Sequence, residues 1–317
     1  MHLVTDETVN VDSGAPELFT ERLMQVQLGR FWRRFGSRRN SEYDPTQAEQ
    51  TYEQFCAEYL PSLSPAFALK PDTKWDRSFP RLAMQRQLLY ICIFDSICWN
   101  FRPLLLLKPS QIASLPLYKQ VLLQSQKKVL AIAALRELEA ISALHAMFNG
   151  SYTQFGAIIF NTFEASVLLL TLCTDPGCPV DDDDNLGQVL GLEGGRLNRK
   201  RFIQAAERGL ERLQMLAEIN DMAASGARTL AQLFFNVSKD VDSSVSPMTS
   251  DESSWSASLP SALSDLLGYD PYTGYPVSSD YPNASLMAEP LPLMAPEGSY
   301  SNLQLPSLDF MNTLDFE

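Results

Sequence analysis

Three long apolar segments determine how this chain can fold: RLAMQRQLLYICIFDSICWNFR (residues 81–102), LYKQVLLQSQKKVLAIAALRELEAISALHAMF (residues 117–148) and YTQFGAIIFNTFEASVLLLTL (residues 152–172). Each is longer than a typical strand, lacks an internal proline and is bounded by helix-terminating residues, which are Pro103, Pro116 and the Asn149-Gly150 pair. Apolar side chains recur at helical spacing in the third segment and leave little polar face: Phe155, Ile159, Phe163, Val167 and Leu170. This pattern is typical of a helix buried nearly all round. The three segments predict the centre of an all-helical core.

Helix start and stop signals precede this centre. An amphipathic stretch runs from Glu17 to Phe35 and closes at a glycine. The Asp44-Pro45 pair repeats a helix start, and its apolar residues follow at spacings of three and four until Leu60-Pro61. Two further helices are therefore expected before the apolar segments, joined to them by a proline-bearing loop over residues 63–78.

Another helix is predicted after the centre. Asn198 is a candidate cap, and Gly226 is expected to break the helix. The positions expected to face inward are Phe202, Ala206, Leu210, Leu213 and Ile219. The sequence shows neither an internal repeat nor an alternating strand pattern. We therefore predict an all-α, multi-helix domain over residues 1–236.

The remaining residues, 237–317, differ in charge and composition. They hold one base against twelve acids, whereas the preceding residues hold 24 bases and 26 acids. Nine of the 20 prolines also lie here, so this tail is expected to be disordered and rich in acid, proline and serine. Large apolar side chains cluster beside the acids, as in transcriptional activation segments that dock into hydrophobic grooves. The expected anchors are Leu266, Leu267, Tyr269, Phe310, Leu314 and Phe316.

Cysteine and histidine are too few and too scattered to indicate a metal centre. Five cysteines and two histidines form no repeated Cys-x-x-Cys pattern, so neither a disulfide framework nor a zinc module is indicated. We expect reduced, mostly buried thiols, a partly buried, hydrogen-bonded core histidine at His145, no metal and no cofactor. Gly-x-Ser-x-Gly and glycine-rich phosphate motifs are absent from the sequence as well. These observations predict that the chain is not an enzyme.

The run from Asp181 to Asp184 supports one catalytic alternative. In an all-helical protein, adjacent aspartates can bind Mg²⁺ and a diphosphate, as in terpene synthases. That chemistry needs a second motif on a helix face, but Ala224 and Arg228 occupy the positions where Ser and Glu would follow Asn220. A solvated loop is the favoured interpretation, and a magnesium-dependent lyase is the alternative function.

Two basic clusters are candidate nuclear-import signals. Their residues are Arg33, Arg34, Arg38 and Arg39 in the first, and Arg199, Lys200 and Arg201 in the second. Solvated bases at a helix end, where they complement the helix dipole, are the structural alternative. Direct binding to DNA is less favoured, since the helical domain as a whole is nearly neutral.

A collinear set of segments carries a family resemblance. The segments are Leu82-Ala83-Met84-Gln85-Arg86, Cys98-Trp99-Asn100-Phe101-Arg102-Pro103-Leu104, Ala133-Ala134-Leu135-Arg136-Glu137-Leu138, Tyr152-Thr153-Gln154-Phe155 and Phe160-Asn161-Thr162-Phe163-Glu164-Ala165, preceded by His2-Leu3-Val4-Thr5-Asp6-Glu7. Together they resemble the C-terminal part of the fungal-specific regulatory domain of zinc-cluster (Zn2Cys6) transcription factors. The resemblance implies a helical domain that regulates the activity of the factor, while a cluster of six cysteines reads DNA. That cluster is missing from this sequence, so no residue here inherits the role of a zinc ligand.

These observations predict a nuclear transcription regulator of the fungal zinc-cluster type. Its expected partners are transcriptional coactivators, bound by the tail, and a second chain in a homodimer or heterodimer. DNA would be reached only indirectly or through the missing zinc cluster. No membrane partner is expected, since the apolar run Phe155–Cys173 carries Asn161 and Glu164 within it. A scaffold or ligand-sensing domain without regulatory output is the remaining alternative.

Overall fold

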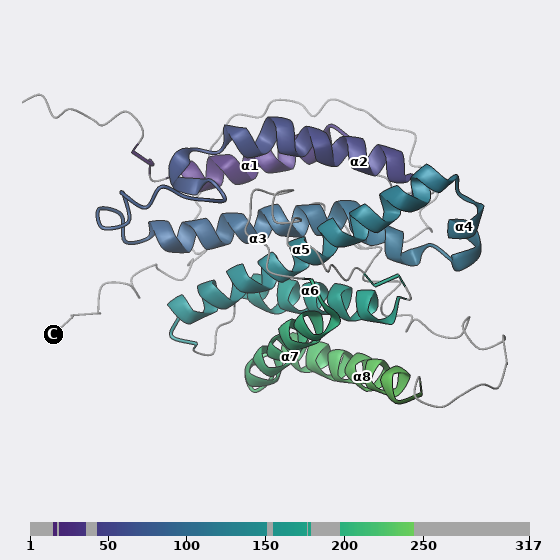
Figure 1. Ribbon diagram of the computed structural model, residues 1–317. Helices are drawn as coiled ribbons and strands as arrows, with labels where there is room; N and C mark the ends of the chain where they lie inside the picture. Colours follow the sequence, from purple (N-terminus) through teal and green to yellow (C-terminus); the bar gives the residue numbers. More distant parts are fainter. Residues whose placement is uncertain are drawn as a thin grey trace, which may run out of the picture. The chain divides into compact units, whose positions relative to one another are not determined.

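The computed structural model describes residues 15–17, 19–35, 43–150, 155–175, 177–178 and 197–243, with side chains described as far as Val237. Regular structure within these residues is entirely helical, as the sequence predicted (Figure 1). The α-helices are α1 (Thr20–Arg33), α2 (Pro45–Gln54), α3 (Leu82–Phe101), α4 (Pro109–Ser114), α5 (Leu117–Met147), α6 (Gly156–Thr174), α7 (Arg199–Leu216) and α8 (Asp221–Ser243). A π-turn at Phe55–Tyr59 continues α2, and short 3-10 turns lie at Leu60–Ser62, Pro65–Phe67 and Arg102–Leu106.

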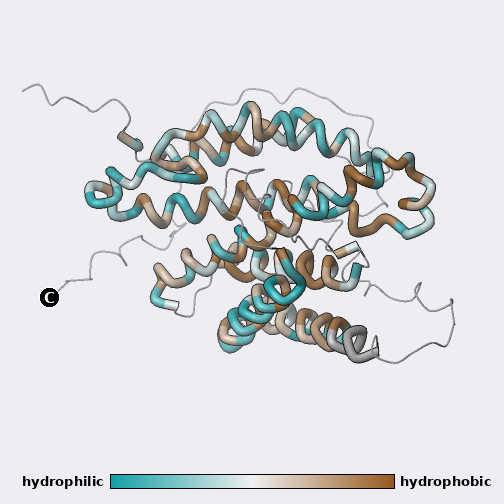
Figure 2. Tube along the Cα trace, in the orientation of Figure 1, coloured by the Kyte–Doolittle hydropathy of each residue, from teal (hydrophilic) through white to brown (hydrophobic). Residues whose placement is uncertain are grey.

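The helices pack in successive layers around α3, α5 and α6. Helix α5 packs along both α3 and α6, while α1 and α2 cover the side of α3 away from α6 (Figure 1). Helices α7 and α8 pack against α6 and against each other. Figure 2 shows that α6 is apolar along most of its length. Helix α7, which packs against α6, is mainly hydrophilic. The apolar core therefore runs through the whole helical domain.

The three apolar segments form the three central helices, as predicted. Pro103 lies in the 3-10 turn that ends α3, and α5 begins directly after Pro116. At the other end of α5, Asn149 and Gly150 both have φ of 59°, and the Gly150 N–H donates to His145 O at 3.0 Å. Glycine reaches this left-handed conformation without strain, and asparagine tolerates it. Local backbone chemistry thus sets the length of α5.

Two of the central helices are apolar enough to span a membrane by length and composition alone. They are α6 and the stretch Leu82–Leu106, but 72% and 61% of their most apolar windows, respectively, are buried in this fold. Buried core helices of globular proteins share this composition. The packing agrees with the interpretation of α6 as a core helix.

The third apolar segment is less uniformly buried than its pattern suggested. Ile159, Val167 and Leu170 are each 1% exposed, as expected. The expectation is wrong for Phe155, which is 41% exposed because it precedes the first residue of α6. Phe163 is only partly buried, since it faces α8 at the edge of the core. A helix covered on most sides still leaves exposure at its end and along one edge.

The helix predicted to run from Asn198 to Gly226 is in fact two helices. Asn198 caps α7 as predicted, since its side chain accepts from the Arg201 N–H at 2.7 Å. The missed break comes at Asn220, whose Oδ1 accepts from the backbone N–H of Met222 at 2.9 Å and so starts α8. Ile219 lies in this break and is 43% exposed, contrary to the expectation that it faces inward. Gly226 lies within α8 and does not break it.

Both glycines of this helical pair allow a close approach to α6. A methyl group on Gly226 would lie 3.4 Å from the Phe163 ring, and one on Gly209 of α7 would lie 2.3 Å from Ser166 Oγ. Ser166 is fully buried, and its hydroxyl donates to Thr162 O at 2.7 Å. The contact between α6 and α7 therefore depends on the missing side chain at position 209.

Helix α8 continues beyond the last residue of the predicted folded domain. Val237 is 4% exposed, and the helix extends to Ser243. Leu230, earlier in the same helix, is fully buried as well. The rest of the acidic tail lies outside the described residues.

Replacing Gly209 by alanine should destabilise the domain by about 1–3 kcal/mol through overpacking against Ser166. Alanine is the better helix former, so propensity alone predicts the opposite sign. Gly29→Ala in α1 is the matched control, because no atom lies within 4 Å of its added methyl group. Urea unfolding followed by circular dichroism measures both changes. Adding Ser166→Ala should remove much of the Gly209→Ala loss, and a Gly209→Ala variant as stable as the native chain would contradict this packing.

Candidate functional site

The first two arginines of the first basic cluster, Arg33 and Arg34, lie at the C-terminal end of α1. Arg34 binds Glu58 at 2.7 Å, and its guanidinium lies 4.5 Å from the centre of the Phe31 ring. Arg33 is exposed. Bases at this end complement the helix dipole, which gives the two residues a structural explanation. Arg38 and Arg39 lie outside the described residues.

The second basic cluster occupies the first turn of α7. Lys200 is exposed, and Arg201 reaches Glu139 of α5 at 3.3 Å. Arg199 is half-buried, and its Nε finds no hydrogen-bond acceptor within the part of the chain that the structure describes. Positive charge at a helix N-terminus opposes the dipole, so the structural explanation offered by the sequence does not apply here. The structure thus places all three bases of the second cluster in one helical turn, and of the first cluster it places Arg33 and Arg34 together at the end of α1.

Several sequence-predicted sites lie outside the described residues. They are the six apolar anchors of the tail and the run Asp181 to Asp184. Within the described residues, no three His, Cys, Asp or Glu side chains are placed to hold a metal ion. His145 is 7% exposed, so it lies in the core as predicted and is more fully buried than expected.

The main polar feature of the core is a cluster of buried charges that the sequence analysis missed. It joins Asp95 of α3, Glu137 of α5 and Glu164 of α6 to Arg102, in the turn after α3. All four are at most 9% exposed. Arg102 Nη1 binds Glu164 Oε1, and Asn161 Nδ2 donates to Glu137 Oε1 at 2.9 Å. We call these four residues the buried charge cluster.

One guanidinium cannot compensate three carboxylates in this cluster. The pKa of Asp95 is raised to about 8, first by burial and then by the negative charge of Glu164, against the opposing effect of Arg102. Burial also raises the pKa of Glu137, with additional contributions from Asp95 and Glu164. The Glu164 pKa is raised by burial and lowered by Arg102. The geometry therefore favours protonated carboxyl groups beside a single ion pair.

The buried charge cluster is enclosed by three helices and offers no surface to a substrate. Its role is structural, because the bond between Arg102 and Glu164 joins the end of α3 to α6, and the bond between Asn161 and Glu137 joins α6 to α5. The available signal in the sequence was a charge inside an apolar run, at Asp95 and at Glu164. Neither charge predicts its partner until the packing of the helices is known.

A second buried arginine ties the proline-bearing loop to α3. Arg86 is 4% exposed and donates to Ala66 O at 2.6 Å and Asp72 O at 3.1 Å. Its Nη1 also donates to Asp76 Oδ2 at 2.9 Å. Arg86 and Arg102 both belong to segments that carry the family resemblance, and both act as structural anchors in this fold.

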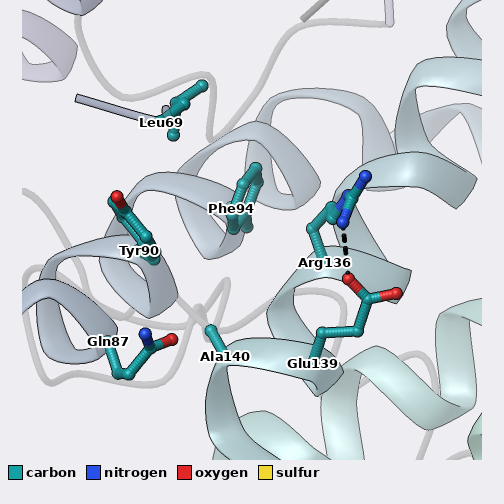
Figure 3. Close-up of a pocket in the computed structure, with 7 residues that line it drawn as sticks. All are labelled: Leu69, Gln87, Tyr90, Phe94, Arg136, Glu139 and Ala140. Carbon is teal, nitrogen blue, oxygen red and sulfur yellow. Dashed lines mark hydrogen bonds and ion pairs between the residues drawn. The ribbon is translucent and has the colours of Figure 1, made fainter. Parts of the chain in front are cut away.

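A small pocket opens between α3, α5 and the loop before α3 (Figure 3). Its volume is about 170 Å³, and its lining residues are Leu69, Gln87, Tyr90, Phe94, Arg136, Glu139 and Ala140. Arg136 Nη1 binds Glu139 Oε2 at 2.8 Å, so the two charged groups of the pocket neutralise each other. Pockets for small ligands usually have volumes of about 300–1,000 Å³. Neither the size nor the polarity of this pocket favours ligand binding.

Two fungal proteins resemble this chain along most of its length. The protein named Transcription factor xilB, from Penicillium rubens, is 50% identical over 297 residues, which are 93% of this chain and 44% of that protein. The protein named Probable transcription factor sol4, from Alternaria solani, is 34% identical over 235 residues, which are 70% of this chain and 42% of that protein. The chain thus spans less than half the length of either relative.

No protein-family profile matches the chain. No solved structure matches it either.

These names agree with two of the sequence-based predictions. Both relatives are named as transcription factors of fungi, which supports a fungal transcription regulator and a chain that is not an enzyme. The magnesium-dependent lyase is not favoured. Neither name specifies a zinc cluster, an activation segment or a nuclear location.

The buried charge cluster should make stability depend on pH. An unfolded aspartate loses its proton near a pH of about 4, whereas folded Asp95 keeps it up to about pH 8. Asp95 therefore contributes stability that is fully present below about pH 4 and lost by about pH 8, because the folded state binds more protons between these values. Asp95→Asn should make the free energy of unfolding fall less steeply as pH rises through this window.

The measurement is urea unfolding at a series of pH values. Asp76→Asn is the matched control, since its carboxyl group bonds to Arg86 and has a lowered pKa. This control should keep the native slope between about pH 5 and pH 8, where a carboxyl of lowered pKa stays ionised. Identical slopes for the native chain and Asp95→Asn would show that Asp95 does not hold its proton in the fold.

Proposed function

We propose that this chain acts in the nucleus as a transcription regulator of the fungal zinc-cluster type. Residues 1–236 constitute its helical regulatory domain, and residues 237–317 its acidic activation segment. The observation that carries the proposal is the 50% identity, over 93% of the chain, to a fungal protein named as a transcription factor. The collinear motifs that resemble the zinc-cluster regulatory domain supply the more specific assignment.

The division of charge supports separate roles for the two parts. The helical part has 24 bases and 26 acids, whereas the tail has one base and twelve acids. An excess of acids beside leucine, phenylalanine and tyrosine suits a segment that binds coactivators through a few apolar anchors. The acids speed the encounter with a basic partner and keep the anchors soluble.

Contact with DNA is a separate matter from activation. The 317 residues contain no cysteine cluster of the zinc-binding kind, and the helical part is nearly neutral. We therefore propose that the regulator reaches DNA through a partner, through a second copy in a homodimer or heterodimer, or through a zinc cluster that this sequence does not include. Salt-dependent binding by the isolated chain is not expected, because few phosphates would be neutralised.

The tail should activate transcription when it is tethered to DNA. Fused to a heterologous DNA-binding domain, residues 238–317 should drive a reporter gene in a fungal host. Replacing the apolar anchors by alanine should reduce the signal to that of the DNA-binding domain alone, because the coactivator groove then has nothing to bury. The replaced residues are Leu266, Leu267, Tyr269, Phe310, Leu314 and Phe316.

The matched control replaces Asp309 and Asp315 by asparagine, which keeps every anchor and removes two charges. This variant should be weakened but active, since the acids assist the encounter without filling the groove. A silent fusion would favour a scaffold or ligand-sensing domain without regulatory output. Activation that is indifferent to the alanine changes would reject the assigned anchors.

The second basic cluster should direct nuclear import. Replacing Arg199, Lys200 and Arg201 by alanine, in the full chain fused to a fluorescent protein too large to diffuse through nuclear pores, should shift fluorescence to the cytoplasm. Lys70→Ala with Arg77→Ala is the control, since both bases are exposed and lie outside the clusters. Import that persists in the first variant, but fails when Arg33, Arg34, Arg38 and Arg39 are replaced, would assign the signal to the first cluster.

A further inference from the structure

Two cysteines lie together where α6 ends. Cys173 is in the last turn of the helix and is 5% exposed, whereas Cys178 is half-buried. A turn centred on Asp175 brings the second cysteine back towards the helix: the Cys178 N–H donates to Asp175 O at 2.9 Å, and the Gly177 N–H donates to Asp175 Oδ1 at 2.8 Å. Both thiols are free.

The two side chains contact each other and the start of α7. Cys173 is hydrogen-bonded to the Cys178 side chain. Its sulfur also lies 4.0 Å from Arg199 O. The thiol pair thus sits at the junction between the end of α6 and the first turn of α7.

Positive charge faces this pair from two other helices. Lys127 of α5 is 4% exposed and binds Asp175 Oδ2 at 2.6 Å, beside the turn. Arg199 of α7 carries a buried Nε that has no hydrogen-bond acceptor among the described residues. A thiolate at Cys178 would therefore meet one base already paired with Asp175 and one whose Nε has no acceptor among the described residues.

This environment distinguishes Cys178 from the other cysteines. The hydrogen bond from Cys173 lowers the pKa of Cys178, and Arg199 and Lys127 lower it further against the opposing effects of burial and Asp175. Burial raises the pKa of Cys56, Cys98 and Cys92, the last to about 12. Since the thiolate is the reactive form, Cys178 combines access, activation and a neighbouring thiol.

We propose that Cys173 and Cys178 are a site of reversible oxidation, which hydrogen peroxide converts into an intramolecular disulfide. The Cys178 thiolate attacks the peroxide oxygen, the O–O bond breaks, and the leaving hydroxide takes a proton to become water. The product is a sulfenic acid at Cys178. The Cys173 sulfur then displaces its hydroxyl group, which leaves as a second water with the Cys173 proton. Two thiols are oxidised, and one peroxide is reduced to two waters.

The disulfide would alter the junction between the end of α6 and the first turn of α7 and would leave the packing of the core helices unchanged. It would link the last turn of α6 to the segment that follows it, and it would remove the thiolate that faces Arg199. Disulfides in reducing compartments are usually transient and redox-sensing, which suits a half-buried pair with one activated sulfur. This inference does not depend on the proposed function, because its readouts are chemical.

The experiment treats the reduced full chain with hydrogen peroxide and blocks the remaining thiols with iodoacetamide. Cleavage before Asp175 separates Cys173 from Cys178 unless a disulfide joins them, so non-reducing mass spectrometry detects the link directly. We expect this linked product before any oxidation of Cys56, Cys92 or Cys98, and its loss on addition of dithiothreitol. At neutral pH, iodoacetamide alone should alkylate Cys178 at least about tenfold faster than Cys56.

Single variants separate the two roles. In Cys173→Ser, oxidation should stop at a sulfenic acid on Cys178, which dimedone traps. In Cys178→Ser, Cys173 should stay reduced at the same peroxide concentration, and Cys92→Ser should form the link as the native chain does. Circular dichroism of the unoxidised variants verifies that they are folded. Oxidation of Cys56 or Cys92 as fast as Cys178, or the absence of the linked product in the folded native chain, would overturn the proposal.

Discussion

The ion pair between Arg102 and Glu164 is the constraint on which the packing of the central helices depends. Removing two charges from water costs several kcal/mol per ion, and mutual attraction offsets this only when the geometry is good. A pair of apolar side chains at these positions would avoid the free-energy cost of removing charges from water. The charges add specificity, because Arg102 binds Glu164 of α6 and the carboxyl groups of Asp95 and Glu137 interact electrostatically with Glu164 in the same cluster. The cluster therefore favours one register of α3, α5 and α6 over alternatives that the apolar surfaces alone would accept.

The outer layers follow from this register. Arg86 continues the same helix as Asp95 and holds the loop that precedes α3 through two backbone carbonyls. On the other side, α6 presents Ser166 to Gly209, and the absent side chain fixes how closely α7 approaches. A shift of α6 along α5 would separate Glu164 from Arg102 and would move Ser166 away from Gly209. The position of α6 is thus restricted by the ion pair of Glu164 with Arg102 and by the close contact of Ser166 with Gly209.

The sequence predicts the elements better than it predicts their environments. The spacing of apolar residues and the prolines and glycine at the segment ends locate α3, α5 and α6. The caps at Asp44 and Asn198 can be predicted because a cap residue and its helix are adjacent in sequence. Asn220 is a cap residue of the same kind, but the apolar pattern continues across it, so the sequence analysis predicted one helix instead of two. The buried charge cluster was not readable, since its members come from residues 95 to 164 and only tertiary packing joins them. The contact between Cys173 and Cys178 similarly needs the turn at Asp175. The tail anchors lie outside the described residues and stay a prediction.

The two basic clusters differ in how much of their charge the fold explains. Arg34 has a carboxylate partner, an aromatic ring beneath it and a favourable helix end. At α7 the bases stand at the unfavourable end, and the buried Nε of Arg199 finds no acceptor among the described residues. Such an arrangement costs stability unless something else compensates the charge. A thiolate at Cys178 would meet that need at Arg199, while exposed Lys200 stays available to a partner. At the N-terminus of α7, the contacts among the described residues therefore account for Arg201, which binds Glu139, and leave Arg199 Nε without an acceptor.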